Sequence, residues 1–104
     1  MERYKVLVTQ SANTDVVEIG NYIAVKLAEP VTADKLIEAI QYAVLGLSHM
    51  PHRCPLVDDK HLAGLGYRKL HVKNYLVFFT IDEKFNTVNV ERILYARRDW
   101  LHIL

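Results

Sequence analysis

The fold is decided by residues 67–104, which read YRKLHVKNYLVFFTIDEKFNTVNVERILYARRDWLHIL. Runs rich in β-branched and aromatic residues predict three strands, at residues 67–72, 75–81 and 87–95. The links between them are the pair Lys73-Asn74 and a turn at residues 82–86. Because links this short join neighbouring antiparallel strands, the stretch predicts a three-stranded meander.

The preceding half of the chain predicts one strand and two helices. Residues 4–9, YKVLVT, are rich in β-formers and predict a strand. Apolar residues then recur at spacings of three and four, first up to about Ala28 and again up to about Ser48, before Pro51. The expected N-caps are Ser11, Asn13 or Asp15 for the first helix and Thr32 for the second.

This order, β-α-α-β-β-β, predicts a single α+β domain over residues 1–104, in which a helical hairpin packs on a curved antiparallel sheet. Residues 51–66 are expected to form an irregular loop, and part of the opposite sheet face is expected to stay open. Alternation along the last strand places Val88, Val90 and Leu94 on the core face. Arg92 then needs a rim position or a paired carboxylate.

Composition narrows the class of protein. The first 50 residues hold four basic and six acidic residues, and the remainder holds nine basic and six acidic residues. This modest tilt permits a local anion-binding surface. We expect a cytoplasmic protein without a signal peptide, membrane span or cofactor, and the single Cys54 excludes an internal disulfide.

A dense cluster, Arg97-Arg98-Asp99-Trp100, follows the last predicted strand. Arginine suits phosphate or carboxylate because its planar guanidinium donates two parallel hydrogen bonds. The cluster therefore predicts contact with a polyanion or an acidic protein. In the alternative, one arginine pairs with Asp99 or Glu91 as a structural clamp. Trp100 is expected to anchor the C-terminal segment on the core rather than to stack on RNA.

Over essentially its whole length the chain resembles the RelE/ParE superfamily of bacterial type II toxins. The resemblance rests on the element order and on the pattern YRKL-x-V-x-NY-x-V-F-F-x-ID followed by ILYARRDW. It also rests on the helical hairpin with its internal proline, NYI…LAEPVTADKLIEAI, and on the loop that begins with Met50 and Pro51.

The resemblance implies a toxin that a cognate antitoxin holds inactive, and operator DNA that is contacted mainly through the antitoxin. One branch of the superfamily enters the ribosome and cleaves mRNA. The other branch inhibits DNA gyrase and has no nuclease activity. The third possibility is a non-toxic binding module on the same fold.

For the nuclease branch, the resemblance assigns basic sites to Arg68 and to Arg97 or Arg98. These cations would stabilise the pentavalent phosphate while a base activates the 2′-hydroxyl. Three features depart from the nuclease pattern: Leu76 where an arginine is common, Tyr95 where a histidine is common, and no tyrosine near the C-terminus. Tyr95 could replace the base only if neighbouring cations lowered the pKa of its phenol.

The sequence gives weaker evidence on the faces and roles of the remaining polar residues. Of Arg68 and Lys69, only one can face a concave site, and Arg68 is the prediction. His71 could act as an acid or base near neutral pH, although alternation puts it on the face opposite Arg68. The remaining residues are predicted to be structural: His49, His52 and His61 as solvated loop side chains rather than metal ligands, Cys54 as a buried or unreactive thiol, and Tyr75, Phe78 and Phe79 as core.

The sequence therefore predicts a toxin that cleaves mRNA on the ribosome, with gyrase inhibition as the alternative. The residues assigned to the nuclease are Arg68, His71, Tyr95, Arg97 and Arg98.

Overall fold

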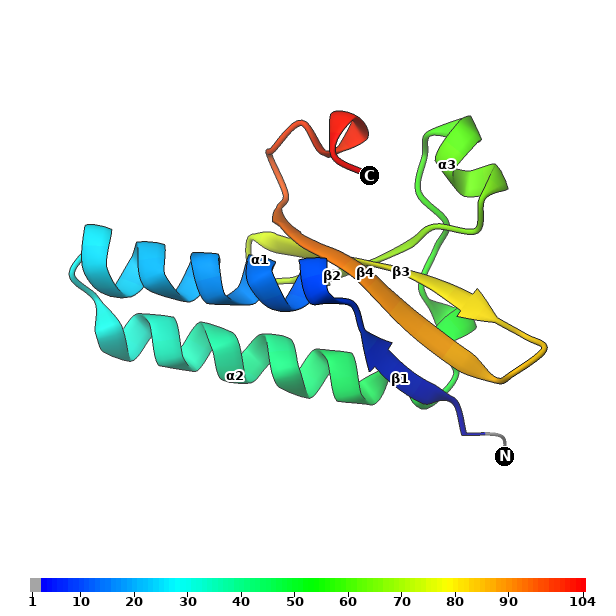
Figure 1. The fold of residues 1–104 in the computed structure, drawn as a ribbon, viewed down its shortest axis with the longest axis horizontal. Coiled ribbons are helices and arrows are strands. Elements are labelled where there is room, and N and C mark those ends of the chain that lie inside the picture. The colour runs from blue at the N-terminus through cyan, green and yellow to red at the C-terminus, as the bar shows by residue number, and fades with distance from the viewer. Residues whose placement is uncertain (1–2) are drawn as a thin grey trace.

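A helical hairpin packs on one face of a four-stranded sheet in the computed structural model, which describes residues 3–104 (Figure 1). The predicted α+β class and element order are confirmed. The strands are β1 (Lys5–Val8), β2 (Arg68–Val72), β3 (Tyr75–Asp82) and β4 (Thr87–Tyr95), and the α-helices are α1 (Gln10–Asn21), α2 (Pro30–Gly46) and the short α3 (Lys60–Gly64).

The strands lie in the order β1-β4-β3-β2. The antiparallel meander of β2, β3 and β4 is confirmed. The first strand, β1, joins it alongside β4 in the parallel direction, so the whole sheet is mixed. A parallel neighbour needs a long crossover connection, which the helical hairpin and the following strands provide.

β4 contains one extra residue, which reverses the faces predicted for the side chains at the end of this strand. Phe78 pairs with Arg92, whereas the next residue, Phe79, pairs with Val90, so Glu91 forms a β-bulge. The bulge reverses the alternation beyond it. Ile93 therefore joins the core beneath the helices together with Val90, and Leu94 faces the other side. The prediction that Leu94 shares the face of Val88 and Val90 was wrong for this reason.

Asp15 of α1 fastens the helical hairpin to β4. Its carboxylate accepts hydrogen bonds from Nε and Nη2 of Arg92, both at 2.8 Å, and from the backbone N–H of Ile93 at 2.9 Å. Asp15 is only 5% exposed. Its hydrogen bonds raise the pKa of the Arg92 guanidinium further, although burial lowers it. The predicted need of Arg92 for a carboxylate is thus confirmed.

The helix starts differ from those predicted. Thr9 caps α1, because its Oγ1 accepts a hydrogen bond from the Ala12 N–H at 3.1 Å, so the proposed caps Ser11, Asn13 and Asp15 were wrong. α2 begins at Pro30, since a proline is well tolerated in the first turn, and Thr32 lies inside the helix. None of the helices within residues 3–104 has the length and apolar character needed to cross a bilayer.

Two local features shape the hairpin itself. α1 continues as a π-helical turn over Tyr22–Lys26, and this turn ends close to the predicted end at Ala28. Gly20 allows close approach of the two helices, because a Cβ atom there would lie 2.7 Å from Cδ1 of Ile37.

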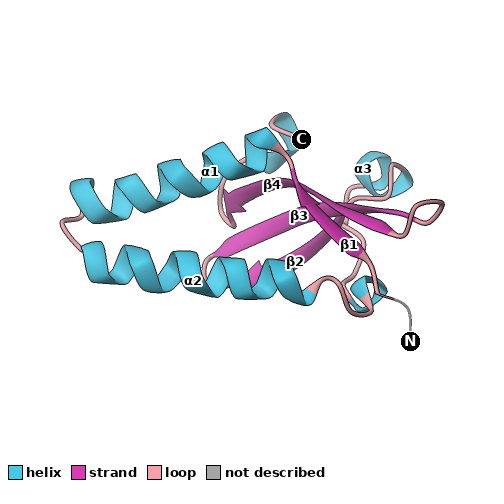
Figure 2. Ribbon diagram, turned by 60° about the horizontal axis from the view of Figure 1, so that its bottom comes forward, coloured by secondary structure: helices cyan, strands magenta, loops and turns pink. Residues whose placement is uncertain are grey.

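A second apolar cluster covers part of the sheet face opposite the hairpin. Figure 2 shows the ribbons of α3 and of the C-terminal end above the sheet, with α2 below it. The cluster joins Phe78, Leu76 and Leu94 of the sheet to Leu62 of α3 and to Trp100 of the C-terminal segment. The ring centroids of Trp100 and Phe78 lie 5.1 Å apart, so the predicted anchoring role of Trp100 is confirmed. The predicted irregular loop at residues 51–66 instead contains α3, where the Asp59 carboxylate caps the helix through the Leu62 N–H at 2.9 Å.

Replacing Asp15 with Ala should lower the free energy of unfolding by about 3 kcal/mol, because it leaves Arg92 and the Ile93 N–H without their shared acceptor. Urea unfolding followed by circular dichroism measures the change. The matched control is Asp34→Ala, an exposed carboxylate on α2, which should change stability by less than about 0.5 kcal/mol. Equal effects of the two substitutions would show that Asp15 does not fasten the hairpin.

Candidate functional site

The five residues predicted for catalysis lie at two separate ends of the sheet. Arg68 lies at one end of β2 and pairs with Phe79. Tyr95 pairs with Tyr75, and Tyr75 pairs with Val72, so Tyr95 lies level with the other end of β2. Arg68 and Tyr95 are offset by four residues along the strand direction and by two strand spacings across the sheet. Their backbones therefore lie roughly 16 Å apart. Groups that act on one phosphate must lie within hydrogen-bonding reach of it, at about 3 Å.

The Arg68 guanidinium is hydrogen-bonded to the backbone of the preceding loop. Its Nη1 donates hydrogen bonds to the carbonyl oxygens of Cys54 at 2.6 Å and of His52 at 3.4 Å. The strand register places Arg68 on the face of Phe79, beneath the helices, and places Lys69 and His71 on the opposite face. The predicted opposition of Arg68 and His71 is confirmed. Catalytic roles for either residue stay predictions.

A polar clasp at the same end ties three distant segments together. The Glu83 carboxylate contacts Nε2 of His52 through one oxygen and accepts a hydrogen bond from the Tyr4 hydroxyl at 3.1 Å through the other. The Tyr4 and His52 rings also meet edge to face, with centroids 5.8 Å apart. Together with Arg68, this clasp holds the loop before α3 against the sheet. Sequence reasoning missed Glu83, because nothing near it in the sequence indicates its partners.

The three loop histidines differ in their surroundings. His49 and His61 are exposed, and His52 is paired with Glu83. Within the described residues 3–104, no three His, Cys, Asp or Glu side chains gather closely enough to hold a metal ion. Burial raises the pKa of the Cys54 thiol more strongly than the nearby arginines lower it, so the thiol is a poor nucleophile.

At the opposite end of the sheet, Arg97 and Arg98 are exposed and available for a partner. Neither side chain forms an ion pair within residues 3–104. The alternative in which Asp99 or Glu91 clamps one of them is therefore wrong: Asp99 lies 3.4 Å from His102, and Glu91 accepts a hydrogen bond from Thr80.

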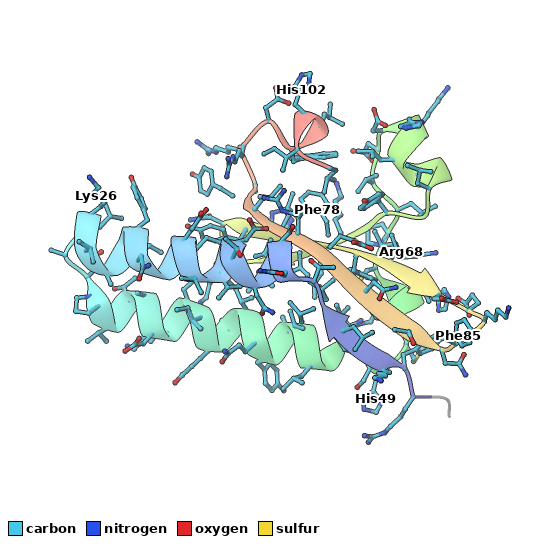
Figure 3. The ribbon with its side chains drawn as sticks, viewed as in Figure 1. Lys26, His49, Arg68, Phe78, Phe85 and His102 are labelled. Carbon is cyan, nitrogen blue, oxygen red and sulfur yellow. The ribbon has the colours of Figure 1, made fainter. Side chains whose placement is uncertain are left out.

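The backbone around the two arginines is held in place. The Ala96 N–H donates to the Asn74 carbonyl at 2.8 Å, and the Arg98 N–H donates to the Tyr95 carbonyl at 3.0 Å. Trp100 then fixes the following turn on Phe78, which lies between the sheet and the segment that carries His102 (Figure 3). Figure 3 also shows Arg68 well away from His102. Two exposed cations are thus presented from a fixed edge.

A groove of about 990 Å³ opens beside Arg98, between the helical hairpin and this end of the sheet. Its floor is apolar and includes Ile19, Ile23 and Leu36. Three tyrosines and several charged side chains line its walls: Tyr22, Tyr75, Tyr95, Glu18, Glu29, Lys35, Lys73 and Arg98. An apolar floor with a charged rim suits an amphipathic peptide helix.

Tyr75 is unsuited to act as a base in the groove. Tyr75 and Tyr95 meet edge to face, with ring centroids 5.6 Å apart. Burial raises the pKa of the Tyr75 phenol, and the neighbouring phenols of Tyr95 and Tyr22 raise it further. Tyr75 therefore remains protonated at neutral pH.

Comparison with known proteins yields one family and a set of similar folds. The family model described as "ParE toxin of type II toxin-antitoxin system, parDE" matches residues 6–100. No curated protein matches the sequence significantly.

Two solved structures illustrate the similarity of fold. A chain of the chromosomal ParDE toxin–antitoxin system from P. aeruginosa superposes with a TM-score of 0.75, at 18% identity, over 91% of this chain and 98% of that chain. A chain of the toxin–antitoxin complex RelBE2 from Mycobacterium tuberculosis superposes with a TM-score of 0.62, at 19% identity, over 89% of this chain and 98% of that chain. At these identities the likeness concerns the fold alone.

The contacts of Arg68 predict a structural role that mutagenesis can test. Arg68→Ala should lower the free energy of unfolding by about 2 kcal/mol, because it leaves the Cys54 carbonyl without its charged donor. Arg68→Lys should recover part of the loss. Lys69→Ala, which removes only a 3.9 Å contact with exposed Asp58, should cost less than about 0.5 kcal/mol in urea unfolding. If Arg68→Ala is as stable as the unchanged protein, the structural role is wrong and Arg68 is again a candidate for a functional role.

Proposed function

Because the chain belongs to the ParE toxin family of the type II toxin–antitoxin systems, we propose that this toxin acts by binding DNA gyrase rather than by cleaving mRNA. The observation that carries the proposal is the separation of the predicted nuclease residues. Arg68 binds loop carbonyls at one end of the sheet, and Arg97 and Arg98 stand free at the other. This separation argues against the nuclease that the sequence favours.

The exposed arginines supply the contact in this proposal. A guanidinium binds a carboxylate or phosphate through two parallel hydrogen bonds, and neither Arg97 nor Arg98 must first give up an ion pair within residues 3–104. Their backbone is fixed by Trp100 and by the Ala96–Asn74 hydrogen bond. Such preorganisation reduces the entropy lost on binding a protein surface.

A cognate antitoxin is the second partner in this proposal. The two solved structures compared above come from toxin–antitoxin systems, which supports such a partner here. The groove between the hairpin and the sheet is the surface best suited to it, because a helix with one apolar face could bury that face on the apolar lining, which includes Ile19 and the exposed Leu27. Arg98 lies in the wall of the groove, so a bound antitoxin would also cover one of the two free arginines.

Replacing both Arg97 and Arg98 with Ala should abolish growth arrest on induction without unfolding the protein, because both side chains are exposed. The decisive measurement is inhibition of gyrase supercoiling by the purified protein, where the double variant should lose activity by at least about tenfold. Lys60→Ala, an exposed cation on α3, is the matched control and should inhibit as the unchanged protein does.

The same induction distinguishes the two toxin mechanisms. Mapping of mRNA 5′ ends should show no new cleavage sites, while double-strand DNA breaks and an SOS response accumulate. New 5′ ends at codons within the ribosomal A site, with intact DNA, would replace gyrase binding with mRNA cleavage. Unimpaired growth with folded protein would favour a non-toxic binding module.

The groove predicts a separate effect on the antitoxin. Leu27→Glu places a charge among the apolar residues of the groove and should weaken antitoxin binding by at least about tenfold, as measured by calorimetry. Leu45→Glu makes the same change on an exposed leucine of α2 outside the groove and should leave the affinity unchanged. Equal affinities of the two variants would place the antitoxin elsewhere on the toxin.

A further inference from the structure

The outer face of α2 carries a stripe of exposed side chains. Residues at spacings of four and three share one side of a helix, because each residue advances the helix by about 100°. On the solvent side of α2, the residues with this spacing are Val31, Lys35, Glu38, Tyr42 and Leu45, and all are exposed. We call these five residues the outer stripe. Its three apolar members are unusually open to solvent, because Tyr42 is 83% exposed, Leu45 68% and Val31 64%.

The opposite side of α2 fixes the direction of the outer stripe. Leu36, Ile40 and Val44 are buried in the core between the hairpin and the sheet, so the outer stripe points away from that core. α2 runs along the margin of the molecule in Figure 1 and Figure 2, with α1 and the sheet on its other side. A second protein could therefore approach the whole length of the outer stripe.

The two charges of the outer stripe are available to a partner. Within residues 3–104, neither Lys35 nor Glu38 takes part in an ion pair. A lysine that precedes a glutamate is also the less favourable order for a pair within one helix. Along the stripe, Val31 precedes these charges and Tyr42 follows them. The order apolar, basic, acidic, apolar is complementary to itself when it is reversed.

We propose that α2 is a self-association surface, on which the outer stripes of two copies of this chain pack antiparallel about a two-fold axis. In this register, Glu38 of each copy faces Lys35 of the other copy. Both facing pairs are centred on the same point of the helix, so Tyr42 of each copy also packs on Val31 of the other copy. The two-fold axis repeats each contact and gives two ion pairs and two apolar contacts.

A parallel pairing of the same helices is disfavoured. It would bring Lys35 opposite Lys35 of the other copy and Glu38 opposite Glu38, and like charges across an interface repel. Antiparallel helices also place the positive end of one helix beside the negative end of the other. The outer stripe therefore favours a reversed copy of itself, which supplies the complementary charge at both charged positions.

The dimer is expected to be weak and reversible. α2 contains 17 residues and is about 25 Å long. Stable interfaces take roughly 20–30 residues from each side, which is more than one helix face supplies. Dimers should therefore form at high protein concentration and exchange with monomers. The outer stripe includes neither Arg97 nor Arg98, so pairing through α2 uses a different surface from the proposed gyrase contact.

The test is sedimentation equilibrium of the chain of residues 1–104, at concentrations that rise into the millimolar range. We expect a reversible equilibrium between monomer and dimer. Lys35→Glu or Glu38→Lys places like charges at both facing pairs, and each should weaken dimerisation by at least about tenfold. Lys60→Glu, which reverses an exposed charge on α3, is the matched control and should leave dimerisation unchanged. Circular dichroism checks that each variant is folded.

A mixture of the two single variants gives the most specific result. In the mixed dimer, each acidic side chain of the Lys35→Glu variant faces a lysine of the Glu38→Lys variant. The mixture should therefore dimerise at least about tenfold more tightly than either variant alone. The double variant Lys35→Glu/Glu38→Lys should likewise recover dimerisation, because each facing pair is again of opposite charge.

The apolar contact is tested separately. Tyr42→Ala removes the largest exposed side chain of the outer stripe and should weaken dimerisation by at least about tenfold. Phe85→Ala removes another exposed aromatic, in the turn between β3 and β4, and should have no effect.

Three outcomes would overturn the proposal. The first is a monomer at every concentration. The second is a dimer that the charge reversals leave unchanged, because such a dimer would use another surface. The third is a mixture that dimerises no better than its components, which excludes the antiparallel register. Lys35 also lines the groove proposed for the antitoxin. The assay contains neither antitoxin nor gyrase, so its failure is distinguishable from failure of the proposed function.

Discussion

The contact of Asp15 with β4 is the interaction on which the rest of the structure depends. β4 extends beyond the end of β1, and there α1 takes the place of a neighbouring strand. The buried carboxylate satisfies both the Ile93 N–H and the Arg92 guanidinium, which would otherwise leave polar groups unpaired at this junction. Asp15 also lines the groove, so this contact joins the hairpin to the sheet at the wall of the groove.

The elements that could be predicted from the sequence have local causes. Short stretches of sequence are enough to recognise the apolar stripes of the helices, the turn at Lys73-Asn74 and the apolar run of β3. The bulge at Glu91 and the parallel pairing of β1 have no such signal, because they depend on which strands meet. α3 escaped prediction because its five residues are too few to show a helical period, although Asp59 is a recognisable cap.

The candidate site was harder to predict than the fold. Arg68, Arg97 and Arg98 are equally basic in sequence, but only the structure distinguishes an arginine held by loop carbonyls from two that are free. Backbone carbonyls as partners leave no trace in the residue pattern. The same holds for the clasp of Tyr4, His52 and Glu83, whose members come from three distant segments. The molecule therefore has one end fixed by internal contacts and another that offers cations and a groove.

The bulge at Glu91 also limits how roles can be transferred between relatives by sequence alignment. A relative whose last strand lacks the extra residue would align without a gap, yet every side chain after this point would face the other side of its sheet. Tyr95 would then be equated with a residue on the wrong face, although the aligned letters matched. An alignment of this chain with such a relative requires a gap of one position within β4 before any residue beyond Glu91 is compared.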